Sequence, residues 1–269
     1  MTDYEGFLDM PDDEYRAADG LNWSKLKLIG DSPYLYDYRR THPRADTPSM
    51  MLGRAVHAAV LQPEVYAEDW KIYDGARRGK GWLQFSRIYQ DDYEIITVAE
   101  AETVDRIVQR VKAHGEAAHL LALGGLNERA IFWEERGRRM KAKIDRTCYA
   151  GDRGPLFVVD LKTTRDLTPD SFGRAADNFG YIGQIEHYAT GVEHLTGRTV
   201  IPLLLVVENA EPFDVGVFHI PVSHRDMGAR LRTTYLDTLE RCEREDTWPG
   251  RVPKMIDLPI PRWSKLRTM

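Results

Sequence analysis

The sequence predicts an α/β protein in which a mixed central β-sheet is flanked by helices. The first observation is a short apolar run, residues 156–159, with the pattern of a strand buried on both faces. The second is that strand and amphipathic helix patterns follow one another as far as residue 245. A length of 269 residues with 42% hydrophobic content fits one domain with elaborations or, less simply, two small domains. We expect a single domain over residues 1–269, with a helical region over 1–48 and an irregular tail over 247–269.

Composition limits the classes of function. The formal net charge of −5 gives no overall basic signal for nucleic acid, although a nucleic-acid enzyme needs only a local basic track. Cys148 and Cys242 lie far apart, and two cysteines support neither a disulfide framework nor a zinc or iron–sulfur site. The N-terminus lacks a signal-peptide core, and the longest apolar run, Ile201–Val207, is too short to cross a bilayer. We therefore expect a cytoplasmic protein that has no contact with membranes.

Helices are predicted in the first sixty residues. Two short ones are expected over Leu21–Arg40, where Ser32 is a suitable cap and Pro33 fits the first turn that follows. A longer helix is predicted over Ser49–Leu61, with its first residue as the cap. His57 lies at the edge of the apolar surface of this helix. A histidine in that position is either a hydrogen-bonded core residue, which is the commoner case, or a metal ligand.

Residues 74–82 form a glycine-rich basic segment that contains Arg77, Arg78 and Lys80. A flexible loop of this composition suits contacts with DNA phosphates and can become ordered when DNA binds. It equally fits a mobile solvated loop, so both interpretations stay open. A helix over Thr97–Lys112 is predicted to follow, with a capping box at its N-terminus.

A β-hairpin is predicted over residues 139–164, with the turn signal at Gly151–Pro155. Side chains alternate along a strand, so Asp160 and Lys162 point to the same face of the second strand. Asp145 lies on the first strand, and the hairpin geometry can bring it beside Asp160. The simpler alternative is an ordinary ion pair at the end of a strand.

Two neighbouring carboxylates and a lysine form a chemically specific set. Carboxylate oxygens are hard ligands that suit Mg²⁺ or Mn²⁺. A lysine beside such a site can orient or deprotonate a water molecule, or neutralise charge that develops on a phosphate. An aspartate followed by an Asp-x-Lys strand is therefore the framework of metal-dependent phosphodiester hydrolysis. Lys141 and Lys143, on the same strand face as Asp145, are candidate DNA contacts.

The remainder of the chain continues the α/β pattern. Helices are predicted over Pro169–Asn178, Tyr181–Leu195 and Ser223–Glu245, and a strand pair over Val200–Val207 and Asp214–Ile220. In the second of these helices a glutamine and a tyrosine, Gln184 and Tyr188, are four residues apart and share a face.

Several short motifs follow one another along the chain. They are residues 53–57, 128–134, 143–145, 159–164, 181–188, 248–249 and 261–263. As an ordered set they resemble the exonuclease VIII (RecE-type) nuclease domain, which belongs to the PD-(D/E)xK superfamily. The resemblance runs from about residue 21 to the C-terminus. It implies a PD-(D/E)xK nuclease-like mixed sheet.

The resemblance also implies roles for individual residues. The metal ligands would be His57, Asp145, Asp160 and the backbone carbonyl of Leu161, with Mg²⁺ as the metal and Mn²⁺ as a substitute. The remaining catalytic residues would be Lys162, Gln184, Tyr188 and Glu128. Lys162 would position the attacking water, Gln184 and Tyr188 would lie beside the scissile phosphate, and Glu128 would be an acid near the site. Many relatives carry glutamate in place of Asp160, but the exonuclease VIII branch uses aspartate.

The function implied is a metal-dependent exonuclease that degrades linear double-stranded DNA 5′→3′ and leaves single strands for recombination. Members of this family form rings and often come from phage or prophage genes, which implies a homo-oligomer and a single-strand annealing protein as partner. The alternatives are an endonuclease or Cas4-like nuclease, and a catalytically retired DNA-binding protein. The lack of a cysteine quartet disfavours the iron–sulfur Cas4 type. The intact charged residues disfavour retirement, because buried charges are costly to keep.

Overall fold

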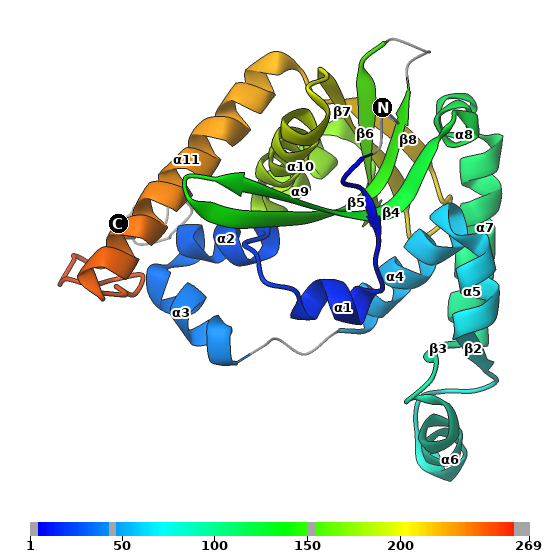
Figure 1. Cartoon of the computed structure of the whole chain (residues 1–269). Coiled ribbons are helices and arrows are strands. Elements are labelled where there is room, and N and C mark those ends of the chain that lie inside the picture. The colour runs from blue at the N-terminus through cyan, green and yellow to red at the C-terminus, as the bar shows by residue number, and fades with distance from the viewer. Residues whose placement is uncertain (1–4, 43–46, 150–153, 261–269) are drawn as a thin grey trace, which may run out of the picture. The chain divides into compact units, whose positions relative to one another are not determined.

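The computed structural model describes residues 5–42, 47–149 and 154–260 (Figure 1). The chain divides into two compact units. The first comprises Met1–Trp23 and Ala45–Arg232, and the second comprises Ser24–Arg44 and Thr233–Met269. The expectation of a single domain over the whole chain stays a prediction. Among the described residues no helix is both long and apolar enough to span a membrane.

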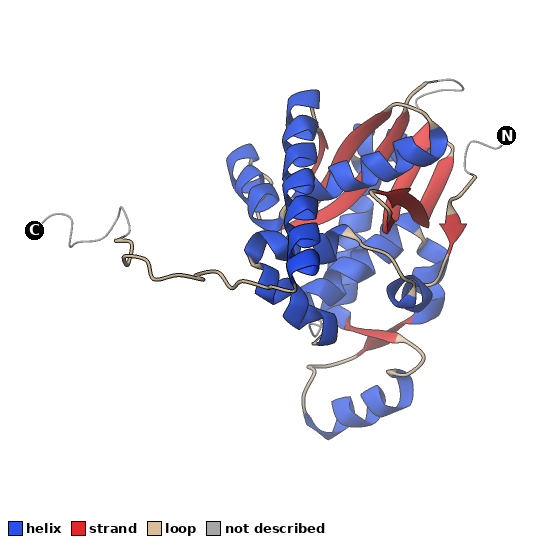
Figure 2. Cartoon of the chain, turned by 60° about the vertical axis from the view of Figure 1, so that its left-hand side comes forward, coloured by secondary structure: helices blue, strands red, loops and turns tan. Residues whose placement is uncertain are grey.

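The larger unit is built on a mixed sheet, as the sequence predicts, and among the described residues this sheet has six strands (Figure 2). In spatial order these are β1 (Leu8–Asp9), β4 (Gly125–Glu135), β5 (Arg138–Tyr149), β6 (Leu156–Thr164), β7 (Val200–Glu208) and β8 (Val215–His219). Strands β6 and β7 are parallel, and all other neighbours are antiparallel. The parallel pair needs a crossover, and the two helices between β6 and β7 supply it.

Helices cover both faces of this sheet. On one face α4 (Pro48–Leu61), α7 (Val98–Ala113) and α8 (Gly115–Ala122) pack in an apolar core that includes Val56, Val104 and Leu161. Because Leu161 points to this core, its neighbours on β6, Asp160 and Lys162, point to the opposite face.

The opposite face carries α10 (Tyr181–Thr196), which is preceded by α9 (Pro169–Phe179). The packing of α10 on the sheet is close at Gly191, where an added Cβ would lie 2.7 Å from Trp133 and 2.8 Å from Ile131. Lys162 Nζ of β6 lies 4.9 Å from the ring of Tyr181, the first residue of α10, so α10 begins on the face that carries the charged residues of β6.

A small substructure that the sequence pattern does not predict lies between α4 and α7. It consists of α5 (Pro63–Asp69), β2 (Trp70–Tyr73), α6 (Gly79–Tyr89) and β3 (Glu94–Thr97), with β2 and β3 parallel. The prediction of a flexible loop over residues 74–82 is wrong from residue 79 onward, where α6 begins. Aromatic side chains hold α6 on β2: the Tyr73 ring lies 5.3 Å from Trp82 and 5.1 Å from Phe85.

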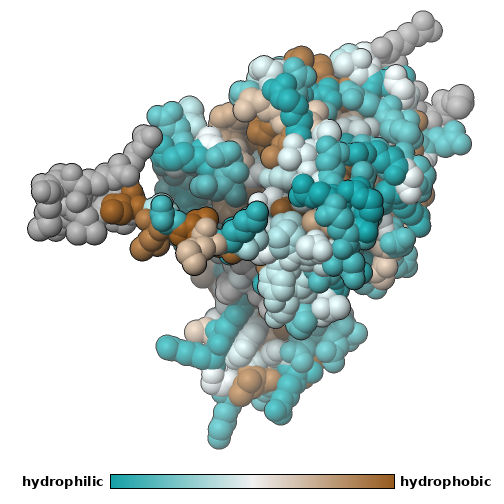
Figure 3. Space-filling view, turned by 90° about the vertical axis from the view of Figure 1, so that its left-hand side faces the viewer, coloured by the Kyte–Doolittle hydropathy of each residue, from teal (hydrophilic) through white to brown (hydrophobic). Residues whose placement is uncertain are grey.

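The second unit contains residues 24–31 of α2 (Trp23–Asp31), α3 (Pro33–Thr41) and the end of α11 (Val222–Glu245). Trp248 stacks on Tyr36 with 5.7 Å between ring centroids. The described part of the tail, residues 247–260, has neither helix nor strand, and the irregular tail over 247–269 stays a prediction. Its apolar side chains are exposed, as the brown atoms next to the grey terminus in Figure 3 show. Residues 261–263, which belong to the family resemblance, lie outside the described residues.

Local signals determine where several helices begin. Ser32 caps α3 by accepting a hydrogen bond from the Leu35 amide, and Thr97 forms the predicted capping box of α7 with Glu100. The cap of α4 is Thr47 and not Ser49, because the Thr47 side chain accepts from the Met50 amide and Pro48 occupies the first turn. The predicted turn between β5 and β6 has residues 151–153 outside the described residues. Helix α1 (Asp12–Ala17) precedes α2.

Candidate metal centre

Three carboxylates lie side by side on three neighbouring strands. In the β4–β5 ladder the pairs Asn127–Arg146 and Arg129–Ile144 flank Glu128, which is therefore opposite Asp145. In the β5–β6 ladder Arg146 pairs with Val159, so the next residue on each strand brings Asp145 beside Asp160. The predicted proximity of the two aspartates is confirmed. Residues opposite each other in antiparallel strands point to the same face, so the three acids converge on one side of the sheet.

Glu128 adopts an unusual backbone conformation for this position. Its φ angle is +51°, in the left-handed region that residues with a Cβ adopt rarely. Such a conformation costs free energy and is retained where the surrounding structure imposes it, which is most common at functional sites. From the sequence, Glu128 is expected only to lie near the site. The structure puts its carboxylate 3.7 Å from the imidazole of His57.

His57 reaches this group from α4. Its Nδ1 lies 3.4 Å from Asp145 Oδ2, and single ligand atoms of His57, Glu128 and Asp145 all lie within 4.8 Å of one another. Burial alone would lower the pKa of His57, but the two carboxylates outweigh burial and raise that pKa to about 9. The histidine thus lies beside two carboxylates and not in an apolar core. Its imidazole and the two carboxylates form a group that could hold a metal ion.

Asp160 and Lys162 form a buried ion pair beside this cluster. Lys162 Nζ lies 2.5 Å from Asp160 Oδ2, and the Asp160 side chain is 1% exposed. Burial raises the pKa of Asp160 to about 6, and repulsion from Asp145 adds to the rise while Lys162 opposes it. Burial would lower the pKa of Lys162, but attraction to Asp160 and Asp145 raises it overall. The pair therefore keeps its charges only because each group compensates the other.

Helix α10 provides the polar groups that face the acids. Gln184 Nε2 donates to Tyr188 Oη over 2.8 Å. Burial raises the pKa of Tyr188 well above its usual value, and the charges of Asp160 and Asp145 raise it further. The Tyr188 hydroxyl is thus neutral, and it lies close enough to both aspartates for their charges to act on it.

The residues present fit a divalent metal ion. Asp160 Oδ1 is buried and has no hydrogen-bond partner among the described residues, whereas Oδ2 faces the Lys162 ammonium. Buried oxygens without donors are costly, and a cation satisfies them. The available ligand atoms are imidazole nitrogen and carboxylate oxygens. Carboxylates suit Mg²⁺ and Mn²⁺, and the imidazole favours the transition metal of the two.

Two residues predicted to contact DNA have internal partners instead. The guanidinium of Arg77 donates to both Glu100 oxygens, over 2.6 and 2.7 Å, and to the Ile95 carbonyl over 3.0 Å. Lys141 is 1% exposed, and its ammonium donates to the carbonyls of Tyr15 and Ala18, each over 2.6 Å. These bonds hold Arg77 on the capping box of α7 and Lys141 inside the protein. The prediction of DNA contacts is therefore wrong for Lys141, and Arg77 has a structural role.

The other predicted DNA contacts differ in their exposure. Arg78 and Lys80 are exposed at the start of α6. Lys143 forms an ion pair with Asp12, and the Lys143 side chain is 17% exposed. These three stay proposals.

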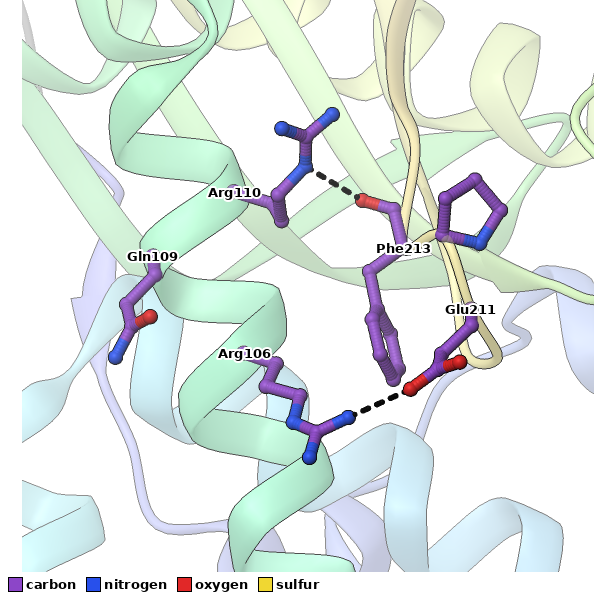
Figure 4. Close-up of a pocket in the computed structure, with 6 residues that line it drawn as sticks. Arg106, Gln109, Arg110, Glu211 and Phe213 are labelled. Carbon is purple, nitrogen blue, oxygen red and sulfur yellow. Dashed lines mark hydrogen bonds and ion pairs between the residues drawn. The ribbon is translucent and has the colours of Figure 1, made fainter.

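A shallow pocket lies elsewhere on this unit, between α7 and the turn that joins β7 to β8 (Figure 4). Arg106 pairs with Glu211 over 2.9 Å, and Arg110 donates to the Phe213 carbonyl over 3.3 Å. Glu211 compensates the charge of Arg106, and Asp214, 3.8 Å from Arg110, compensates the other arginine, so the pocket carries little net positive charge for a phosphate.

Comparisons with known proteins agree with this architecture. The family model described as "PDDEXK-like domain of unknown function (DUF3799)" matches residues 24–255. The crystal structure of a "Putative exonuclease" from Eubacterium rectale is 13% identical, with a TM-score of 0.63, and the alignment covers 94% of this chain and 97% of that chain. At this identity the similarity shows the fold alone.

A second solved structure, named SSO0001, is 12% identical over 69% of this chain and 84% of that chain. Its TM-score of 0.29 is too low to support an argument. No curated protein matches the sequence.

Proposed function

Because this chain belongs to the PDDEXK-like domain family DUF3799, we propose that it is a metal-dependent DNA exonuclease that degrades linear duplex DNA 5′→3′. The observation that carries the proposal is the cluster of His57, Glu128 and Asp145 next to the buried pair of Asp160 and Lys162. Nucleases of this superfamily use divalent metals and act on nucleic acid, and the fold of the chain is theirs. Mg²⁺ or Mn²⁺ is the proposed metal.

The proposed ligands are His57, Asp145 and Asp160, with Glu128 added because of its distance to His57. The Leu161 carbonyl stays a proposal that rests on the resemblance to exonuclease VIII. A bound metal ion would lower the pKa of a water molecule and attract the scissile phosphate. The Leu161 amide donates to Asp145 Oδ2 over 2.7 Å and so fixes that carboxylate toward the cluster.

Lys162, Gln184 and Tyr188 are the proposed partners of the substrate. Lys162 is buried and held by Asp160, so its charge is available to orient the attacking water and to stabilise the charge that develops on the phosphate. The Tyr188 hydroxyl and the Gln184 amide are neutral polar groups that would bind phosphate oxygens. Such preorganised groups lower the barrier because they need no rearrangement during the reaction.

The exonuclease activity, its polarity and its biological setting are proposed from similarity. The Eubacterium rectale protein is named as an exonuclease, and the motif set resembles exonuclease VIII. From that resemblance we propose that the protein forms a homo-oligomer, acts in recombination and has a single-strand annealing protein as partner. A phage or prophage gene is the proposed origin. Arg78, Lys80 and Lys143 are proposed to contact the DNA backbone.

Duplexes labelled at one 5′ or one 3′ end test this proposal, together with closed circular duplex. In Mg²⁺ the 5′ label should leave early as a small product, the 3′ label should stay on long single strands, and circles should be spared. Early loss of the 3′ label would reverse the polarity, and nicking of circles at a comparable rate would favour an endonuclease. Binding of ends without cleavage in Mg²⁺ or Mn²⁺ would favour the retired-nuclease alternative. The Asp160→Ala variant is the control for contaminating nuclease.

A further inference from the structure

An aromatic pair connects the candidate catalytic lysine to the protein surface. Lys162 Nζ lies 4.9 Å from the centroid of the Tyr181 ring, within the range of a cation–π contact. The Tyr181 ring is stacked on Phe179, with 5.7 Å between centroids and 25° between planes. Phe179 is a large apolar side chain that is 57% exposed. Tyr181 therefore lies between Lys162 and Phe179, and Phe179 is in contact with solvent.

The backbone between α9 and α10 creates this arrangement. On one helix, the side chains of residues i and i+2 point in very different directions. Phe179 and Tyr181 would therefore not stack within a continuous helix. Gly180 interrupts the helix with φ 70° and ψ 35°, ends α9 and precedes α10. This left-handed conformation is easy only for glycine, and it allows the two rings to face each other.

The inner ring is supported from below. Phe172 is 4% exposed, and its ring lies 6.1 Å from Tyr181 and 4.9 Å from Phe218. The Tyr181 ring is thus packed on one part of its surface, contacts the lysine with another and leaves Phe179 as the outermost ring. A single exposed phenylalanine is ordinary on a protein surface. Its direct stacking on the ring that contacts the catalytic lysine distinguishes this one.

We infer that Phe179, stacked on Tyr181, is a binding site for a nucleobase of the strand being cleaved. This inference rests on the proposed nuclease function. Every base has a π face, so an exposed aromatic ring binds bases without sequence preference, as an exonuclease requires. The Phe179 ring lies no farther from Lys162 than the two centroid distances together, which matches a nucleotide adjacent to the scissile phosphate. A base stacked there would hold its phosphate in register with Lys162.

Fluorescence of 2-aminopurine tests this site without cleavage. The probe is a single-stranded oligonucleotide that carries 2-aminopurine at one of its terminal nucleotides. The wild-type protein, in EDTA, should quench the fluorescence of this base. Phe179→Ala and Phe179→Leu should lose this quenching, and Phe179→Trp should retain it, because leucine keeps the apolar volume and only tryptophan keeps a ring. The control is Tyr34→Ala, which removes a ring that is 58% exposed and belongs to the other unit. Equal quenching by wild type and Phe179→Leu, or no quenching by wild type, would overturn the inference.

Cleavage of substrates with an abasic nucleotide beside the scissile phosphate gives a second readout. Wild type should cleave the normal substrate roughly 5- to 150-fold faster than the abasic one, the range of one base–aromatic stacking contact. Phe179→Ala should lose that preference, whereas a variant with only a folding defect would lower both rates equally. Wild-type cleavage without any preference would refute the base site and leave the nuclease function intact. No wild-type cleavage in Mg²⁺ or Mn²⁺ would refute the nuclease function, and the quenching assay would then decide the base site.

Discussion

The amide of Leu161 donates a hydrogen bond of 2.7 Å to the carboxylate of Asp145. The bond joins β5 to β6 just beyond the Arg146–Val159 pair, where the antiparallel ladder between the two strands ends. It therefore fixes the distance between the two strands that carry the aspartates. The same Asp145 oxygen lies 3.4 Å from His57 on α4. One carboxylate thus connects the sheet, the helix and the candidate metal centre.

Lys162→Ala should reduce the chemical rate far more than the metal affinity, because the lysine is proposed to act on water and phosphate. Single-turnover cleavage should fall by at least roughly two orders of magnitude, the scale of one preorganised electrostatic group. Calorimetric titration with Mn²⁺ should remain close to that of wild type. A variant that loses metal binding but regains full activity at high Mn²⁺ would show that Lys162 serves the metal site instead.

Variants of the basic residues at the start of α6 should show which of them bind DNA and which stabilise the fold. Replacing Arg78 and Lys80 together by alanine should weaken duplex binding and lower the salt dependence, by about 0.9 in log–log slope for each phosphate that is no longer neutralised. Arg77→Ala should instead lower the free energy of unfolding by about 1–2 kcal/mol, because it removes bonds to Glu100. Binding isotherms at several salt concentrations and urea unfolding measure the two effects. The same salt slope for the double variant and wild type would exclude Arg78 and Lys80 from the DNA path.

The stability of the larger unit should depend on pH through His187. Burial, with Arg232 nearby, lowers the pKa of His187 to about 3, and its two ring nitrogens contact the Lys141 carbonyl and Arg232. The unfolded chain binds this proton near pH 6.5. The stabilisation is therefore complete above pH 6.5 and is lost as the pH falls toward 3, by up to about 1.4 kcal/mol per pH unit.

Urea unfolding of wild type and His187→Gln between pH 7 and 4.5 checks this dependence. The glutamine keeps a polar group but does not titrate, and both proteins share all other ionisable groups. The wild type should lose stability more steeply than the variant as the pH falls. Parallel curves would show that the pKa of His187 is not lowered in the folded protein.

Part of the site was predictable because it depends on short-range pattern. Alternation along one strand predicts that Asp160 and Lys162 share a face, and two strands joined by a turn signal predict that Asp145 is near. Glu128 was underestimated because its role depends on strand register and on a left-handed φ that no sequence pattern indicates.

The DNA contacts are predicted from local composition or from strand alternation, and neither signal reveals partners distant in sequence. Glu100 of the correctly predicted capping box also binds Arg77. Helix α6 had a detectable signal: Trp82, Phe85 and Tyr89 recur at helical spacing, but the surrounding glycines favoured a loop. Pattern therefore located the elements better than it located the interactions between them.

Two glycines in the helices on the α10 face should respond to alanine in opposite ways. Gly191→Ala should destabilise by about 1–3 kcal/mol, because the new methyl group would overlap Trp133 and Ile131. Gly173→Ala in α9 is the matched control, since nothing lies within 4 Å of its added Cβ. It should stabilise by about 0.5–1 kcal/mol through helix propensity. Thermal unfolding measures both, and equal effects would mean that α10 packs less closely than described.

The most direct test of a metal-dependent nuclease site is cleavage of linear duplex in Mg²⁺ by wild type, Asp145→Ala and Asp160→Ala. Wild type should degrade the duplex, and EDTA should stop it. Each variant should lose cleavage while it remains folded at the assay temperature, and Asp160→Ala should lower the thermal stability because it leaves Lys162 without its ion-pair partner. Substantial Mg²⁺-dependent cleavage by either correctly folded variant would contradict the assignment of these two aspartates to the catalytic centre.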